Sequence, residues 1–293
     1  MQSTKNKILK TSLAYLPQTK QEQLAQITEV IVKAVKPEMI ILFGSYARNT
    51  WVHDRHTEGQ HMTDYISDYD ILVITNNDEE RDEHELEDMV ESKCKFKAPV
   101  TVIVHNIETV NLRLSENHYF FSDIKKEGVL LYDSSNYQLA EARILTPAEK
   151  QKIAKDDYEY WFTSAADFME GVDFYFAKSK WNMTAFQLHQ ATERAYHALE
   201  LVFTGYKPRT HNLGKLYRMT KSFSDELPGI FPQNDRQEKH LFKQLKNAYV
   251  DSRYKKTYHI TEPELTTLIE RVKKLHEITE RICIKKIEEL GSA

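Results

Sequence analysis

Four residues near the start of the chain could together hold the phosphates of a nucleotide and a metal ion. Gly44 and Ser45 follow the apolar run MIILF, and Asp68 and Asp70 stand at the start of the apolar run that ends in ILVI. A strand that ends in Gly-Ser and leads into a helix offers backbone N–H groups and the positive end of a helix dipole to an anion. The turn alone is a weak signal, because Gly-Ser turns are common.

The two aspartates make the signal more specific. Asp68 and Asp70 stand two residues apart, so on a strand both carboxylates point to one face while Tyr69 points away. Two like charges at close range cost stability unless a cation lies between them, and oxygen ligands of this kind suit Mg²⁺. We therefore predict metal-assisted transfer at a nucleoside triphosphate; two surface aspartates at a strand edge are the alternative.

Composition and length indicate a folded, helix-rich protein. The chain has 293 residues, of which 41% are hydrophobic and 29% charged, with only 8 Gly and 8 Pro. Its two cysteines, Cys94 and Cys283, can build neither a disulfide framework nor a metal site, which favours a reducing compartment. The N-terminus lacks the apolar segment of a signal peptide, and no apolar run is long enough to cross a bilayer. We expect a cytoplasmic protein with no membrane contact.

The net charge of −4 argues against a surface covered with basic residues for nucleic-acid binding. Residues 207–221 are an exception, because they carry five Lys or Arg and no acidic residue. This basic segment is either a local nucleic-acid patch or a solvated loop and helix face.

The chain changes character between residues 133 and 147. Before this stretch, short apolar runs rich in β-branched residues alternate with amphipathic segments; after it, about five helical stretches are separated by Gly, Pro or N-capping residues. We predict an α+β protein. A domain over residues 1–138 has a small mixed sheet with helices, and residues 139–293 form an all-α helical bundle.

Residues 10–135 resemble the minimal nucleotidyltransferases of the DNA polymerase β-like superfamily, whose signature is a Gly-Ser turn followed by Asp-x-Asp. The resemblance implies that Asp68 and Asp70 are catalytic ligands of Mg²⁺. It also implies that Gly44 and Ser45 bind the phosphates of ATP or another triphosphate, and that pyrophosphate leaves when a hydroxyl attacks the α-phosphorus. Arg48 is either a further phosphate contact or a surface arginine.

Three features depart from the family pattern. Asn49 stands where members have Gly, and it suits that place because Asn accepts left-handed backbone angles. The gap between the two motifs is long, and residues 46–67 hold an insertion that we interpret as a solvated loop. The third carboxylate of the family falls at Thr101, so the site could bind metal weakly, or bind nucleotide without turnover.

A second pair of residues could act on a phosphodiester. Arg253 and His259 stand at the end of a predicted helix, where a guanidinium and an imidazole could hold a phosphate and exchange a proton. A helix C-terminus also favours cations without any chemistry.

Residues 150–290 resemble the HEPN family of helical bundles. The matching positions are Gln190, Ala191, Glu193, Arg194 in place of Lys, His211, Leu213, Arg253 and His259. The resemblance implies that Arg253 and His259 are a ribonuclease-type catalytic pair for RNA, and that two bundles form a homodimer. It also makes Tyr254 and Tyr258 candidates, by position only, for the tyrosine that a nucleotidyltransferase modifies in toxin–antitoxin members.

Three functions remain open at this point. The first is a Mg²⁺-dependent nucleotidyltransferase that transfers a nucleoside monophosphate, with AMP as the expected group, to an unknown protein or small-molecule acceptor. The second is a metal-independent ribonuclease in the bundle, regulated by the N-terminal domain. The third is a nucleotide-binding protein without catalysis.

Overall fold

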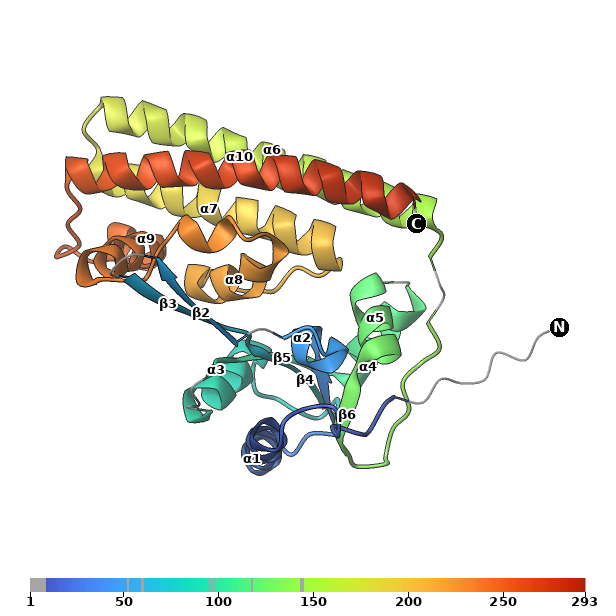
Figure 1. The fold of residues 1–293 in the computed structure, drawn as a ribbon. Helices are drawn as coiled ribbons and strands as arrows, with labels where there is room; N and C mark the ends of the chain where they lie inside the picture. The colour runs from blue at the N-terminus through green and yellow to red at the C-terminus, as the bar shows by residue number, and fades with distance from the viewer. Residues whose placement is uncertain are drawn as a thin grey trace. The chain divides into compact units, whose positions relative to one another are not determined.

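The chain forms two compact units, Met1–Leu145 and Thr146–Ala293 (Figure 1). The sequence prediction placed this division at residues 138/139. The computed structural model describes residues 9–51, 53–58, 61–94, 96, 98–116, 118–142 and 145–292, with the backbone alone for 53–58 and 61–66.

The first unit is built on a four-stranded mixed sheet, in agreement with the predicted α+β fold. The strand order is β5-β4-β1-β6. Strand β1 is antiparallel to β4 and β6, whereas β4 and β5 are parallel. The strands are β1 (Met39–Phe43), β4 (Tyr69–Thr75), β5 (Val100–Asn106) and β6 (Val129–Asp133).

One helix precedes these strands along the chain, and the others lie between them. They are α1 (Gln18–Val35), α2 (Gly44–Arg48), α3 (Glu83–Lys93), α4 (Ile107–Ser115) and α5 (Tyr119–Glu127). Four residues of α1 are buried at spacings of three and four, as expected for one face of an amphipathic helix. They are Leu24, Ile27, Ile31 and Val35, and they join the core that contains alternate residues of β1, β4 and β5.

The insertion within residues 46–67 is not a loop, as the sequence analysis expected, but an antiparallel pair of strands. Strand β2 (His53–Glu58) pairs with β3 (His61–Ile66) along their whole length. The hydrogen bonds between the two strands satisfy backbone N–H and C=O groups that in an irregular loop would bond to water. The pair forms a two-stranded sheet separate from the main one.

Glutamates of α3 cover the open edge of β5. The backbone N–H of Val104 donates to Oε1 of Glu87 at 3.1 Å, and that of Val102 donates to Oε1 of Glu91 at 3.0 Å. The two acids stand one helical turn apart and the two valines two residues apart. The rise of one helical turn is close to that of two strand residues, so each acid faces one valine N–H. An edge strand with bonded N–H groups is protected from pairing with another chain.

We predict that Glu87→Ala destabilises the first unit by about 1–3 kcal/mol, because the buried N–H of Val104 then lacks its acceptor. Asp88→Ala, an exposed position on the same helix, should change stability by less than about 0.5 kcal/mol. Urea denaturation of the full chain measures both. Equal stabilities for the two variants would show that the edge contact contributes nothing.

The second unit is a bundle of five α-helices among its described residues, which confirms the predicted all-α architecture. They are α6 (Pro147–Ala177), α7 (Trp181–Thr204), α8 (Leu213–Thr220), α9 (Arg236–Tyr254) and α10 (Glu262–Ser292). Short 3₁₀ turns occupy η1 (Lys221–Phe223) and η2 (Leu227–Gly229). Helices α6, α7 and α10 run side by side, and α8 and α9 also pack on α7 (Figure 1).

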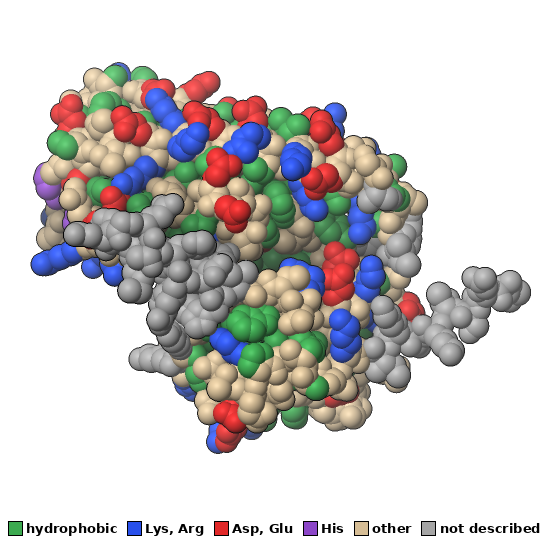
Figure 2. Space-filling view, viewed as in Figure 1, with side chains coloured by type: hydrophobic (Ala, Val, Ile, Leu, Met, Phe, Trp, Pro, Cys, Tyr) green, Lys and Arg blue, Asp and Glu red, His purple; other side chains and the backbone are tan. Residues whose placement is uncertain are grey.

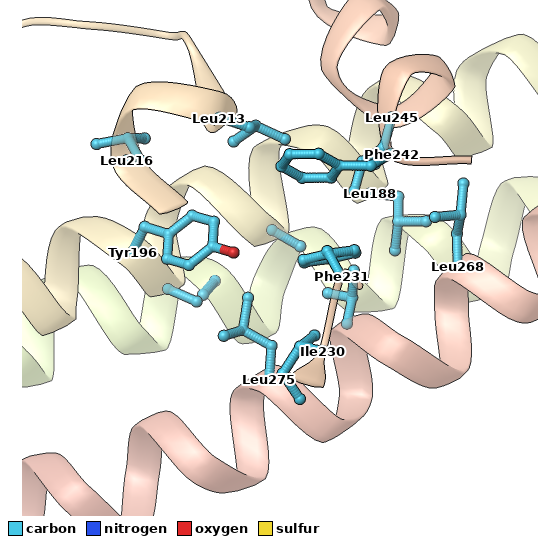
Figure 3. Packing of buried hydrophobic residues seen from close by; sticks show 14 of the residues in the cluster. Leu188, Tyr196, Leu213, Leu216, Ile230, Phe231, Phe242, Leu245, Leu268 and Leu275 are labelled. Carbon is cyan, nitrogen blue, oxygen red and sulfur yellow. The ribbon is translucent and has the colours of Figure 1, made fainter. Parts of the chain in front are cut away.

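Helix α7 is the centre of this bundle, and most of its residues from Thr184 to Val202 are buried. Figure 3 shows how Tyr196 of α7, Phe242 of α9 and Leu275 of α10 converge with Phe231, which precedes α9. Because apolar neighbours surround α7 on several sides, any charged residue on it must find partners inside the protein.

The surfaces of α6 and α10 carry charges of both signs. Figure 2 shows acidic and basic side chains interspersed over the face formed by these helices. A surface of this kind does not attract polyanions strongly as a whole, in keeping with the net charge of −4. Within the described part of the chain, every helix is too short or too polar to cross a membrane.

Candidate functional site

The turn after β1 and the start of β4 form one site. Gly44 has a left-handed φ of +70°, and a Cβ placed on it would lie 2.1 Å from Oδ2 of Asp70. The two come together because β1 and β4 are antiparallel and pair Phe43 with Asp70. Only glycine fits here, since it accepts this backbone angle and leaves room for the carboxylate.

Asp68, the second carboxylate, lies close to Thr101 on the same face of the sheet as Asp70. Thr101 is the register partner of Asp70 on the parallel strand β5, and its Oγ1 donates to Oδ2 of Asp68 at 3.3 Å. Asp68 and Thr101 are both buried, whereas Asp70 is partly exposed. Both carboxylates therefore lie next to the neutral hydroxyl of Thr101.

Tyr69, between the two aspartates, points to the opposite face as predicted. Its ring stacks on that of Tyr46 at 4.3 Å between centroids, and Tyr46 stacks in turn on Trp51 at 5.3 Å. The ammonium group of Lys20 lies 5.3–5.5 Å from the centroids of all three rings. This stack fixes α2 against the start of β4.

The aspartates also influence the pKa of Tyr46 in this stack. Burial, together with the negative charges of Asp68 and Asp70, raises the pKa of Tyr46 to about 12. The tyrosine therefore stays neutral beside the carboxylates at physiological pH. Sequence reasoning did not identify Lys20 or Tyr46, because the contacts join residues far apart in the chain.

The other predicted phosphate-binding residues lie on the short helix α2. Ser45 is partly exposed at its first turn, and its carbonyl accepts the N–H of Thr50 at 2.9 Å. Asn49 ends the helix at φ 58°, so it adopts the left-handed backbone angle that the sequence analysis considered asparagine suited to. Arg48 is exposed, with its Nη1 4.0 Å from Oε2 of Glu127.

The donor chemistry of this site fits Mg²⁺. Asp68 and Asp70 supply carboxylate oxygens, and Mg²⁺ commonly takes one or two carboxylates and completes its shell with water and phosphate. No group of three or more His, Cys, Asp or Glu side chains suited to a metal occurs among the residues the structure describes. The site thus has two acids and a hydroxyl, not three acids.

We predict that Gly44→Ala destabilises the protein by at least about 2 kcal/mol, because the methyl group would displace Asp70 and the backbone angle would be strained. The matched control is Gly229→Ala, where an added Cβ meets nothing within 4 Å. Thermal unfolding of both variants tests the contact. A Gly44→Ala protein as stable as wild type would contradict the described turn.

The predicted pair of the second unit lies at the junction of α9 and α10, and both side chains are exposed. The guanidinium of Arg253 lies over the ring of Tyr249 at 4.6 Å, and its Nε donates to the Tyr249 carbonyl at 2.7 Å. The backbone carbonyl of His259 accepts from Nε2 of Gln244 at 2.8 Å. Within the described contacts, the side chains of Arg253 and His259 do not bond to each other.

Of the two candidate tyrosines, only one is accessible. Tyr254 is 73% exposed. Tyr258 is buried, and its hydroxyl donates to the carbonyl of Gln244 at 3.2 Å. Burial raises the pKa of Tyr258 well above its usual range. As a modifiable residue, Tyr258 is therefore ruled out by its position in the core.

Three histidines surround Glu193; the sequence analysis named Glu193 and His211 as motif positions, but it did not predict their contact or the part taken by His189 and His197. The buried carboxylate lies 3.4 Å from Nε2 of His189, 3.6 Å from Nε2 of His197 and 3.0 Å from Nδ1 of His211. Burial, the largest influence, raises the pKa of Glu193, but the three imidazoles together lower it well below the usual range. The spacing of four residues from His189 to Glu193 and on to His197 could have indicated the cluster.

Comparison with known proteins identifies one domain in each unit. Residues 25–137 match the family model described as Polymerase beta, Nucleotidyltransferase, and residues 158–282 match the HEPN domain. A crystal structure of a nucleotidyltransferase-like protein from Exiguobacterium sibiricum 255-15 aligns with 91% of this chain and 79% of its own, at 12% identity and a TM-score of 0.32. Curated proteins give no match.

Proposed function

Because the chain joins a nucleotidyltransferase-type domain to a HEPN domain, we propose that it is a Mg²⁺-dependent nucleotidyltransferase. It transfers a nucleoside monophosphate, AMP in this proposal, from the triphosphate to a protein or small-molecule acceptor. The observation that carries the proposal is the contact of Asp70 with Gly44. A phosphate held by the turn would lie directly beside the carboxylates.

Each residue has a defined role in this proposal. Gly44 and Ser45 bind the β- and γ-phosphates through backbone N–H groups and the serine hydroxyl, and Arg48 adds a charge at the exposed side. Asp68 and Asp70 would hold Mg²⁺, which when bound neutralises negative charge on the triphosphate. The hydroxyl of Thr101 keeps the Asp68 carboxylate in place.

The reaction needs no covalent intermediate on the protein. An acceptor hydroxyl attacks the α-phosphorus and gives up its proton to water, the bond between the α-phosphorus and the bridging oxygen breaks, and pyrophosphate leaves. The residues named above position the triphosphate. The entropy of bringing it to the acceptor is therefore lost when it binds and not in the chemical step.

We predict that Asp70→Ala lowers Mg²⁺-dependent pyrophosphate release from ATP by at least about a hundredfold, because a ligand worth several kcal/mol of charge stabilisation is lost. Pyrophosphate release and intact-protein mass spectrometry after incubation with ATP measure this directly. An added nucleotidyl mass would also identify the chain as its own acceptor.

Asp78→Ala is the control for this experiment, because Asp78 is an exposed acid just after β4. It should release pyrophosphate at the wild-type rate. Equal release by wild type and Asp70→Ala would refute the transferase proposal.

Thr101 favours a second candidate, a protein that binds nucleotide without turning it over. Thr101→Asp would place a third carboxylate beside Asp68. We predict that this variant unfolds at a lower temperature than wild type in EDTA, because three like charges are close, and that Mg²⁺ reverses the loss. It should bind Mg²⁺ at least about tenfold more tightly in calorimetry, since one more carboxylate ligand is present. A melting temperature independent of Mg²⁺ would exclude a metal site here.

The HEPN unit favours a third candidate, metal-independent cleavage of RNA. Its supporting observation is the exposed Arg253 guanidinium on the same unit as the basic segment 207–221. In this reading His259 exchanges the proton, and two bundles associate as a homodimer. A toxin–antitoxin arrangement, in which the first unit modifies Tyr254, belongs to the same candidate.

A further inference from the structure

The Gly44–Ser45 turn and the aspartate pair are in contact on both faces of the sheet. On the face that carries the carboxylates, Gly44 lies against Asp70. On the opposite face, the ring of Tyr46 from α2 stacks on the ring of Tyr69 from β4, at 4.3 Å between centroids and 25° between planes. Both tyrosines are fully buried. Because Tyr69 stands between the two aspartates, a shift of this stack would change the distance between the turn and the carboxylates.

Helix α1 and the residues just before it contact each of the two tyrosines. The hydroxyl of Tyr15 donates to the backbone carbonyl of Tyr46 at 3.0 Å. The hydroxyl of Tyr69 donates to Oε1 of Gln23 on α1 at 2.6 Å. Each of these hydrogen bonds fixes one tyrosine to the same part of the chain. Neither of them by itself sets the distance from one tyrosine to the other.

Lys20, in the first turn of α1, contacts both tyrosines at once. Its ammonium group lies 5.3 Å from the ring centroid of Tyr46, 5.4 Å from that of Tyr69 and 5.5 Å from that of Trp51. A cation at such distances is attracted by the negative face of each ring, and the attraction grows as water is removed. Rings from α2, from the segment after it and from β4 therefore surround one charge, which holds the three segments together.

The charge of Lys20 also lies near the negative charges of the site. Burial, and to a smaller extent the charges of Asp68 and Asp70, raise the pKa of Tyr46, so the field of the carboxylates reaches this ring. The ammonium of Lys20 lies over the same ring. A positive charge in this place offsets part of the repulsion between the two aspartates in the metal-free protein.

We infer that Lys20 is a positioning residue, which holds the Gly44–Ser45 turn and the aspartate pair at the separation that a triphosphate with its bound Mg²⁺ spans. The inference rests on the proposed transferase function and names the form of its substrate, the metal complex and not the free triphosphate. A ligand that contacts both motifs gains from their preset separation, because little ordering is left to be done on binding. A free triphosphate contacts the turn only and is repelled by the carboxylates.

The decisive variant is Lys20→Met in the full chain, which removes the charge and keeps an unbranched apolar stem. Calorimetry with α,β-methylene ATP, whose bridge to the α-phosphorus is not cleaved, gives one dissociation constant in EDTA and one in Mg²⁺. We expect the ratio of the first constant to the second to fall by about tenfold in Lys20→Met. Loss of a positive charge by itself would strengthen Mg²⁺ binding, so a lower ratio reports the loss of positioning.

Three further variants separate positioning from stability. Lys20→Arg should keep the wild-type ratio, because a guanidinium also stacks on aromatic rings. Lys33→Met removes an exposed lysine of the same helix and should change nothing. Ile31→Val removes one methylene from the buried face of α1, so it should lower the melting temperature and leave the ratio unchanged. A ratio that fell equally in Ile31→Val and Lys20→Met would reduce Lys20 to a stabilising contact and overturn the inference.

The same ratio in wild type and Lys20→Met would also overturn the inference, and the transferase proposal would stand, because that proposal depends on pyrophosphate release. Wild type that binds the Mg²⁺ form more tightly, loses this preference in Lys20→Met and releases no pyrophosphate from ATP would refute the transferase and support the positioning role. Wild type that binds neither form of the analogue would overturn both.

Discussion

A carboxylate that leaves water must be met by donors inside the protein, and this constraint shapes both units. In the first unit, Glu87 accepts a backbone N–H of the edge strand, and Asp68 accepts the hydroxyl of Thr101. In the second, Glu193 is surrounded by three imidazoles. Each acid joins elements that are distant in sequence, so each contact fixes one element against another. Removing any of these acids would therefore change the position of its partners as well as the local charge.

The two candidate sites differ in how they use this constraint. In the first unit, Asp70 stays partly exposed beside the Gly44 turn, where its charge can act on a bound ion or phosphate. In the second unit, the charge of Glu193 is buried and acts through His211, whose ring is exposed. The first arrangement suits chemistry with an added cation. The second suits proton transfer by a side chain of the protein, because the exposed imidazole of His211 contacts the buried carboxylate of Glu193.

Much of the first site could be predicted because its parts are local. Gly44 and Ser45 follow an apolar run, and the spacing of Asp68 and Asp70 fixes their common face on any strand. The interest in Thr101 came from the family resemblance, and the parallel register of β4 and β5 pairs it with Asp70. Contacts such as Lys20 over three aromatic rings could not be predicted, because they depend on how α1 packs against the sheet.

The sequence by itself determined the two kinds of unit, the Gly-Ser turn and the aspartate pair, since periodicity and short motifs act over a few residues. Only the tertiary structure decided three other features: the pairing of β2 with β3, the burial of Tyr258, and the contact of Glu193 with His211. The reason is physical: hydrogen-bond ladders, burial and buried ion pairs depend on segments that the chain brings together from different positions. Glu193 shows this most clearly, because two of its histidines lie on its own helix and the third comes from the loop that leads into α8.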